Sequence, residues 1–147
     1  MRRRTVQRAL ALDMRQWLLL GEALVALAAA SAAINMLPFR RVVRIAARKR
    51  PMAKSPRARR FPPSDVLWAV QAVSWRVPWR TVCFQKGLAL HVMLQRRGIC
   101  SRLHYGVGRG EKNELAAHVW VSVDGQIILG GDVAERFQCL ATYPADC

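Results

Sequence analysis

Apolar residues dominate the chain from Trp17 to Leu37, a stretch rich in leucine and alanine and interrupted only by Glu22, Ser31 and Asn35. This run predicts a helix that ends at Pro38. Its length of roughly 20 residues suits a membrane span, the apolar part of a signal peptide, or a buried or interfacial helix. Because Glu22 is costly inside a bilayer, we favour the buried or interfacial helix.

Basic side chains alternate with apolar ones in the next segment, residues 39–50. This pattern predicts a short amphipathic helix whose face can bind anionic lipid. Residues 51–63 hold four prolines among several cations, which is typical of a linker. Apolar residues with three-four spacing then predict a core-facing helix that Ser64 begins and that runs to about Arg76.

A second strongly predicted helix occupies residues 79–98, with Pro78 just ahead of it. Thr81 can cap its start and Gly98 can close its end. Cys83 then falls in the first turn, where free backbone N–H groups and the helix dipole favour a thiolate over a thiol. Buried free cysteines are common in proteins, so the position alone does not establish a nucleophile.

From residue 102 the apolar pattern changes to a period of two, which predicts a strand over residues 102–107. Residues 115–123 and 126–129 flank Asp124-Gly125, a dipeptide that tight hairpin turns prefer. Residues 133–143 suggest irregular or short helical structure. Helices followed by an antiparallel meander indicate an α+β fold.

The formal charge of +15 is concentrated in one part of the chain. Residues 1–60 hold 15 Lys/Arg against 2 acids, whereas residues 61–147 hold 9 against 7. We therefore predict an apolar and basic helical region over 1–50, a linker over 51–63 and a catalytic domain over 64–147. The uneven charge argues against a nucleic-acid partner and favours a membrane surface or an acidic partner for the N-terminal region.

Four cysteines stand at positions 83, 100, 139 and 147, and no pair has the C-x-x-C spacing. This spacing supports neither a zinc site nor a thioredoxin motif. We expect reduced thiols in the cytoplasm, with Cys100, Cys139 and Cys147 structural or incidental.

His118, on the strand predicted over 115–123, is the candidate base for a Cys83 nucleophile. A cysteine at a helix start facing a histidine on a strand is the geometry of papain-like and transglutaminase-like enzymes. We choose Asp132 to orient the histidine, which requires a bulge at Gly130-Gly131 because a regular hairpin places Asp132 on the wrong face. His91 and His104 are alternative bases.

Several motifs in this chain resemble those of the lasso-peptide leader peptidases, the transglutaminase-like cysteine peptidases of lasso-peptide biosynthesis. The matching runs are PWRTVCFQKGLAL at 78–90, MLQRRGI at 93–99, YGVG at 105–108 and AHVWV at 117–121, followed by Asp124-Gly125. The apolar helix and the PFRR run that starts at Pro38 are also similar to the N-terminal part of those proteins. The resemblance covers nearly the whole chain.

The resemblance implies a transglutaminase-like/papain-like fold and cleavage between leader and core of a ribosomally made precursor. Cys83 is then the nucleophile, His118 the base and Asp132 the third member of the triad. It further implies a separate small leader-recognition protein and an asparagine-synthetase-like lasso cyclase as partners. We expect no cofactor and no metal, with a nucleotide requirement left open, in a cytoplasmic protein that can associate with membranes through residues 17–37.

Two alternatives remain open at this point. The same triad chemistry can transfer the acyl group to an amine, which makes the protein a transamidase. A protein without activity could instead use its basic N-terminal helices as a membrane-associated binding module.

Overall fold

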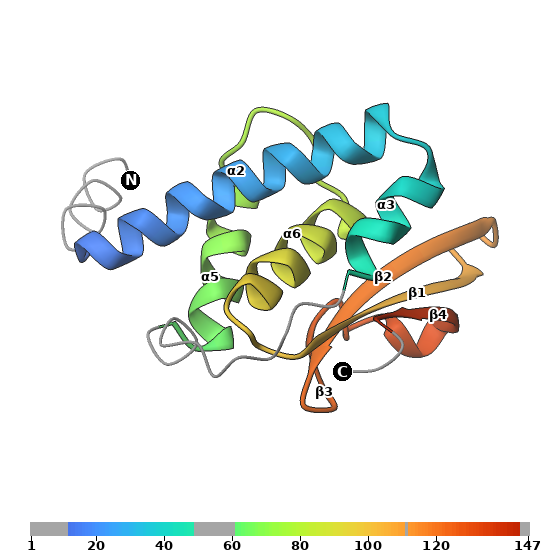
Figure 1. Cartoon of the computed structure of the whole chain (residues 1–147). Helices are drawn as coiled ribbons and strands as arrows, with labels where there is room; N and C mark the ends of the chain where they lie inside the picture. The colour runs from blue at the N-terminus through green and yellow to red at the C-terminus, as the bar shows by residue number, and fades with distance from the viewer. Residues whose placement is uncertain (1–11, 49–60, 111, 145–147) are drawn as a thin grey trace.

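A computed structural model of the chain describes residues 12–48, 61–110 and 112–144. Within these ranges helices form one layer and a four-stranded antiparallel sheet forms the other (Figure 1). The helices are α2 (Met14–Met36), α3 (Phe39–Ala46), α5 (Pro63–Ser74) and α6 (Cys83–Arg96). The sheet contains β1 (Ser101–Arg109), β2 (Leu115–Val123), β3 (Gln126–Leu129) and β4 (Phe137–Tyr143) in the order β3-β2-β1-β4. The predicted α+β class is confirmed.

Helix α2 lies across α5 and α6, and α6 packs in turn on β1 and β2 (Figure 1). One face of α2 is buried in the core through Leu19, Ala23, Leu27 and Ala30. By length and composition α2 could also cross a membrane, and 22% of its most apolar window is buried in the protein. The apolar stretch predicted from the sequence is thus a helix that covers the core with one face.

An ion pair fixes α2 against the end of α6. The two terminal guanidinium nitrogens of Arg97 donate to the two carboxylate oxygens of Glu22, at nitrogen–oxygen distances of 2.6 and 3.0 Å. The side chain of Arg97 is almost fully buried and also donates to the carbonyl of Met93. Glu22, the residue that makes a membrane span costly, therefore has a specific partner 75 residues away in the sequence.

The start of α5 differs from the prediction. Pro62 is the N-cap and Pro63 the first helical residue, so Ser64 is not the cap. Proline suits this first position because the helix leaves its N–H unpaired in any case. The helix ends at Ser74 rather than near Arg76.

Helix α6 ends as the sequence predicts. Gly98 has a φ of 72° and its N–H donates to the carbonyl of Gln95, while Ile99 N–H donates to that of Leu94. These two bonds are the Schellman arrangement that a left-handed glycine allows. The turn leads the chain directly into β1.

Strand β1 is central and pairs with both β2 and β4. The predicted hairpin of β2 and β3 is confirmed, with Asp124 at φ 49° and Gly125 at φ 81° as its turn requires. The prediction for residues 133–143 is wrong in part. A short 3-10 helix η1 (Ala134–Arg136) is present, but residues 137–143 form the edge strand β4.

The cysteines differ in state. Cys83 and Cys139 are free thiols, whereas Cys100 is disulfide-bonded. The expectation of a reduced thiol is therefore wrong for Cys100. Most of the predicted linker and the first 11 residues lie outside the described residues.

Candidate active site

Cys83 is the first residue of α6, and the local sequence fixes this start. Val82 has extended φ and ψ of −97° and 173°, and its N–H donates to the side-chain oxygen of Gln85 at 2.7 Å. The buried Gln85 side chain thus holds the residue that precedes the helix. Thr81 is not the cap that we predicted, because its hydroxyl donates to the Ser74 carbonyl at 3.3 Å.

The surroundings of Cys83 favour negative charge. The first helical hydrogen bond runs from Lys86 N–H to the Val82 carbonyl, so the N–H groups of Cys83 and Phe84 stand outside the helical ladder. No acidic residue lies in the first turn. The half-buried thiol at the positive end of the helix is therefore placed where backbone N–H groups can donate to an oxyanion formed next to it.

Gly87, one turn after Cys83, sets how closely α6 approaches the sheet. A Cβ at this position would lie 2.7 Å from the Cγ1 of Val119 and 3.4 Å from a Leu103 methyl group. Only glycine permits this approach without movement of the helix or the strand. The packing places the beginning of α6 against β1 and β2, near the end of β2 that carries His118.

His118 is half-buried and has one defined hydrogen bond. Its Nε2 lies 2.8 Å from the carbonyl oxygen of Gly130. A carbonyl only accepts, so Nε2 carries a proton, and in the neutral ring Nδ1 is the nitrogen with the lone pair. The ring also lies 5.0 Å from the ring centre of Phe137 and 6.1 Å from that of Trp120. His118 thus has the tautomer that a base acting through Nδ1 requires.

The structure does not bring Cys83 and His118 into direct contact. Val119 and Val121 point toward α6, and alternation along the strand turns His118 to the side of Trp120 and Phe137. Within the described ranges no hydrogen bond joins the thiol to the imidazole.

Asp132 is exposed, two residues beyond the glycine that binds His118. The ladder pairs Val121 with Leu129 but Ser122 with Ile127, so the bulge lies earlier than we predicted, at residue 128. This shift is the one that would bring Asp132 level with His118. However, the ladder ends at Leu129 and Gly130 turns the chain with a φ of 74°. The role of Asp132 stays a prediction.

Gly130 is the residue near His118 that sequence reasoning missed. A Cβ there would lie 2.8 Å from the Val119 carbonyl and 3.1 Å from Nε2 of His118. Its missing side chain and its positive φ together let the carbonyl reach the imidazole. The Gly130-Gly131 pair after β3 was the available signal, which we had interpreted only as a place for a bulge.

The two alternative bases have other roles in the fold. His91 is fully buried, with Nε2 at 2.9 Å from the Ala46 carbonyl and Nδ1 at 2.9 Å from the Ser101 hydroxyl. Burial lowers the pKa of His91, against a smaller opposite effect of the bond to Ala46. Both nitrogens are used, so His91 is a structural residue.

His104 ties the central strand to both neighbours. Its nitrogens lie 2.8 Å from the Ser122 hydroxyl and 3.0 Å from that of Thr142, and its ring stacks on Trp120. Burial, and then the charge of Arg102, lower its pKa. Of the three histidines, His118 alone retains a nitrogen without a partner in the part of the chain that the structure describes.

Among the described residues no three His, Cys, Asp or Glu side chains gather closely enough to hold an ion.

Comparison with known proteins gives one match. The model of a family described as the transglutaminase-like superfamily matches residues 23–142. No curated protein and no solved structure matches the chain. The matched range contains most of α2, all of α6 and the sheet except Tyr143, the last residue of β4, and so includes every residue of the candidate site.

Proposed function

This chain belongs to the transglutaminase-like superfamily, and we propose that it is a cysteine peptidase that removes the leader from a lasso-peptide precursor. The superfamily includes cysteine peptidases and acyl transferases. The observation that carries the proposal is Cys83, a free and half-buried thiol at the first position of α6. The resemblance of residues 78–90 and 117–121 to leader peptidases supports the choice of substrate.

The proposed reaction proceeds through an acyl-enzyme. His118 takes the proton of the Cys83 thiol on Nδ1, and the thiolate attacks the carbonyl carbon between leader and core. The N–H of Cys83 donates to the resulting oxyanion. The C–N bond then breaks, His118 protonates the amine of the core, and the leader remains as a thioester on Cys83. Water, deprotonated by His118, releases the leader acid and restores the thiol.

The mechanism places one requirement on the structure. Because Cys83 and His118 do not touch in this arrangement, Nδ1 must come within hydrogen-bond reach of the thiol when the substrate binds. Val119 and Val121 face α6, so His118 lies on the other face of β2, and this approach requires a change of register in β2. The bond from Nε2 to Gly130 supports the proposal, since it fixes the tautomer while leaving Nδ1 available.

We propose that a second protein presents the leader to this chain. After α5, α6 and the sheet are accounted for, few described residues remain to form a surface that reads a leader. A recognition protein that binds the leader raises the effective concentration of the scissile bond near Cys83 without new contacts in the site. The asparagine-synthetase-like cyclase would then act on the released core.

Cleavage of the precursor, followed by mass spectrometry with and without the recognition protein, tests the proposal. We expect slow cleavage by this chain alone and a large gain with the partner. Cys83→Ala and His118→Ala should abolish cleavage. Cys139→Ala, which removes the second free thiol among the described residues, is the matched control and should stay active. An active Cys83→Ala variant would falsify the nucleophile assignment.

The products separate hydrolysis from acyl transfer. A peptidase releases the leader as a free acid, whereas a transamidase joins it to an amine. Equal rates with and without the recognition protein would remove the partner from the proposal but leave the peptidase in place.

A further inference from the structure

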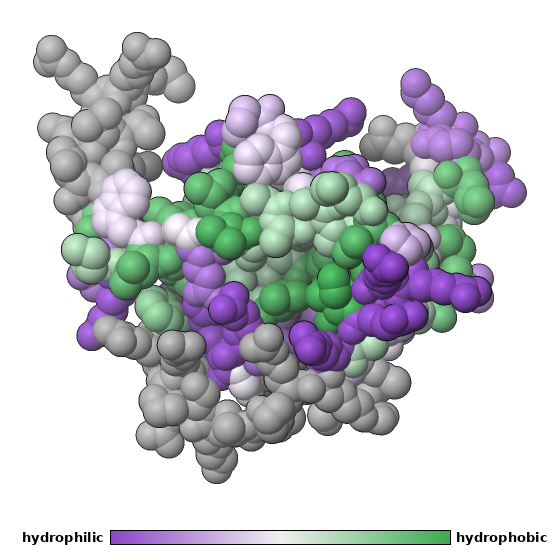
Figure 2. All heavy atoms as spheres, turned by 45° about the horizontal axis from the view of Figure 1, so that its top comes forward, coloured by the Kyte–Doolittle hydropathy of each residue, from purple (hydrophilic) through white to green (hydrophobic). Residues whose placement is uncertain are grey.

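The face of α2 that points away from α5 and α6 is almost entirely apolar. Leu18, Val25 and Met36 are 66%, 67% and 81% exposed. We call this surface the outer face of α2; its exposed residues include Trp17, Leu18, Gly21, Leu24, Val25, Ala28, Ala29, Ala32 and Met36, and the polar Asn35 near its end. It extends along a helix of roughly 35 Å. Figure 2 shows it as a hydrophobic band on the side of the molecule that carries α2.

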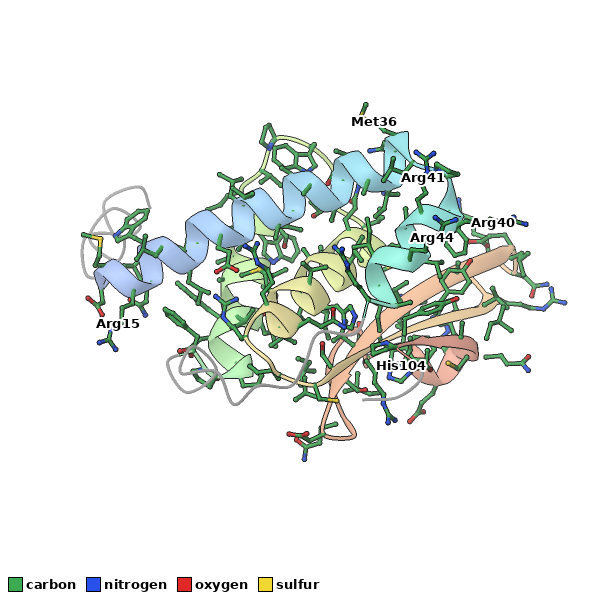
Figure 3. The ribbon with its side chains drawn as sticks, in the orientation of Figure 1. Arg15, Met36, Arg40, Arg41, Arg44 and His104 are labelled. Atoms are coloured by element: carbon green, nitrogen blue, oxygen red, sulfur yellow. The ribbon has the colours of Figure 1, made fainter. Side chains whose placement is uncertain are left out.

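Positive charges stand at both ends of this band. Arg15 lies at the start of α2, and the exposed Arg40, Arg41 and Arg44 belong to α3 beside its end (Figure 3). In the described part of the chain no carboxylate lies within ion-pair distance of these four guanidinium groups. The surroundings of the outer face of α2 are therefore predominantly basic, with the exposed Asp13 as a carboxylate at the start of the helix.

The opposite face of α2 decides between a helix that crosses a membrane and one that lies on it. Leu19, Ala23 and Leu27 are at most 2% exposed, and Glu22 is bound by the buried Arg97. Insertion across a bilayer would pull these residues from the core and leave a buried guanidinium without its partner, which is strongly destabilising. The family match also includes most of this helix. Helix α2 is thus part of the folded domain.

We propose that the outer face of α2 lies in the plane of an anionic lipid surface. The apolar side chains enter between the headgroups, and the arginines of α3 contact the lipid phosphates. Trp17 and Phe39, both about half exposed, stand near the two ends of the band, where aromatic rings favour the membrane interface. The charge at the edges favours anionic lipid over a protein partner, because four exposed arginines stand there against one exposed carboxylate, that of Asp13.

This inference is independent of the peptidase proposal and needs no substrate to test. The full-length protein is floated with vesicles of phosphatidylglycerol and phosphatidylcholine, and with vesicles of phosphatidylcholine alone. We expect binding to the anionic vesicles only, weakened by salt. Val25→Asp should weaken the binding by more than roughly tenfold, and so should the double variant Arg40→Glu/Arg44→Glu.

Matched controls change the same charge elsewhere. Leu115→Asp alters an equally exposed apolar residue at the start of β2, and Arg109→Glu/Arg136→Glu reverses two cations on the sheet layer. Both should bind as the wild type does. Two results overturn the inference. The first is no binding to anionic vesicles, which would assign the face to a protein partner. The second is that Val25→Asp and Arg40→Glu/Arg44→Glu float as well as the wild type, which would assign lipid binding to another part of the chain.

Discussion

At the scale of single residues, the imidazole of His118 is held by a backbone carbonyl. The sequence indicated an acidic side chain for this role, because such residues commonly orient a catalytic histidine. In the structure the Gly130 carbonyl occupies the hydrogen-bonding position at Nε2, and the Asp132 side chain is exposed two residues later. A neutral carbonyl fixes the tautomer as a carboxylate would, but it stabilises the imidazolium less.

Mutation distinguishes the role of the Gly130 carbonyl from that of the Asp132 side chain. Gly130→Ala introduces a Cβ 3.1 Å from Nε2 and strains a positive φ, so we expect precursor cleavage to fall by at least roughly tenfold. Asp132→Asn should keep most of the activity if the carbonyl alone orients the ring. If Asp132→Asn is inactive and still folded, the aspartate moves to His118 in the substrate complex, as the sequence-based hypothesis requires.

Because His91 is buried, we predict that the folded protein loses stability in acid. Its pKa is lowered in the folded protein from the ordinary value of 6.5, chiefly by burial. Below that pH the unfolded chain binds a proton that the folded chain does not, so stability falls as the pH drops, by at most about 1.4 kcal/mol per pH unit for one histidine. Urea unfolding at pH 7.5, 6.5 and 5.5 measures this slope, which His91→Gln should reduce. An unchanged slope in that variant would assign the acid sensitivity to other groups.

At the scale of elements, the contact of α6 with β2 determines where Cys83 lies. Gly87 permits the approach, and its close neighbour is the branched side chain of the buried Val119, which has little room to move. Alanine is the better helix former by about 1 kcal/mol. We nevertheless expect Gly87→Ala to lower both stability and activity, because the added methyl group pushes α6 off the sheet.

Thermal unfolding together with cleavage assays measures this effect. Gly21→Ala is the matched control, since a Cβ there meets nothing within 4 Å and the helix should only gain from it. If Gly87→Ala is as stable and active as the wild type, the packing of α6 on β2 is looser than the structure has it.

The packing of α2 on α6 depends on the ion pair of Glu22 with Arg97. Glu22→Ala leaves the guanidinium of Arg97 buried without a carboxylate, which costs about 3–5 kcal/mol. We expect a lower urea midpoint for Glu22→Ala and a smaller change for Glu22→Gln, which keeps a hydrogen-bond acceptor. A helix that crossed a membrane would respond in the opposite way, with better membrane insertion after loss of the charge.

At the scale of the whole molecule, the sequence predicted those turns and element ends that neighbouring residues determine. The Asp124-Gly125 turn and the alternation on β2 predicted the hairpin, and Gly98 predicted the end of α6. Strand β4 escaped prediction because it is an edge strand with no alternation, and Gln138, Cys139 and Leu140 are exposed in succession.

Long-range pairs could not be predicted from the sequence. A helix that is apolar on all sides gives no sign in the sequence of which face is buried. In the structure the ion pair of Glu22 with the distant Arg97 marks the face of α2 that packs on the core. The carbonyl of Gly130 likewise has no side chain to mark its role in the sequence. The candidate nucleophile was predictable because its type and its place at a helix start are both local, whereas its relation to His118 depends on the fold.

Intact-protein mass spectrometry of a quenched reaction tests most directly whether Cys83 is the nucleophile of a leader peptidase. The full-length protein is mixed with precursor and recognition protein, and the reaction is stopped in acid within one turnover. The mass of the intact protein is then measured. We predict an adduct with the mass of the leader acyl group, mapped to Cys83, absent from Cys83→Ala and formed normally in Cys139→Ala. Release of leader and core with no adduct at any time, at an equal rate in Cys83→Ala, would contradict the account.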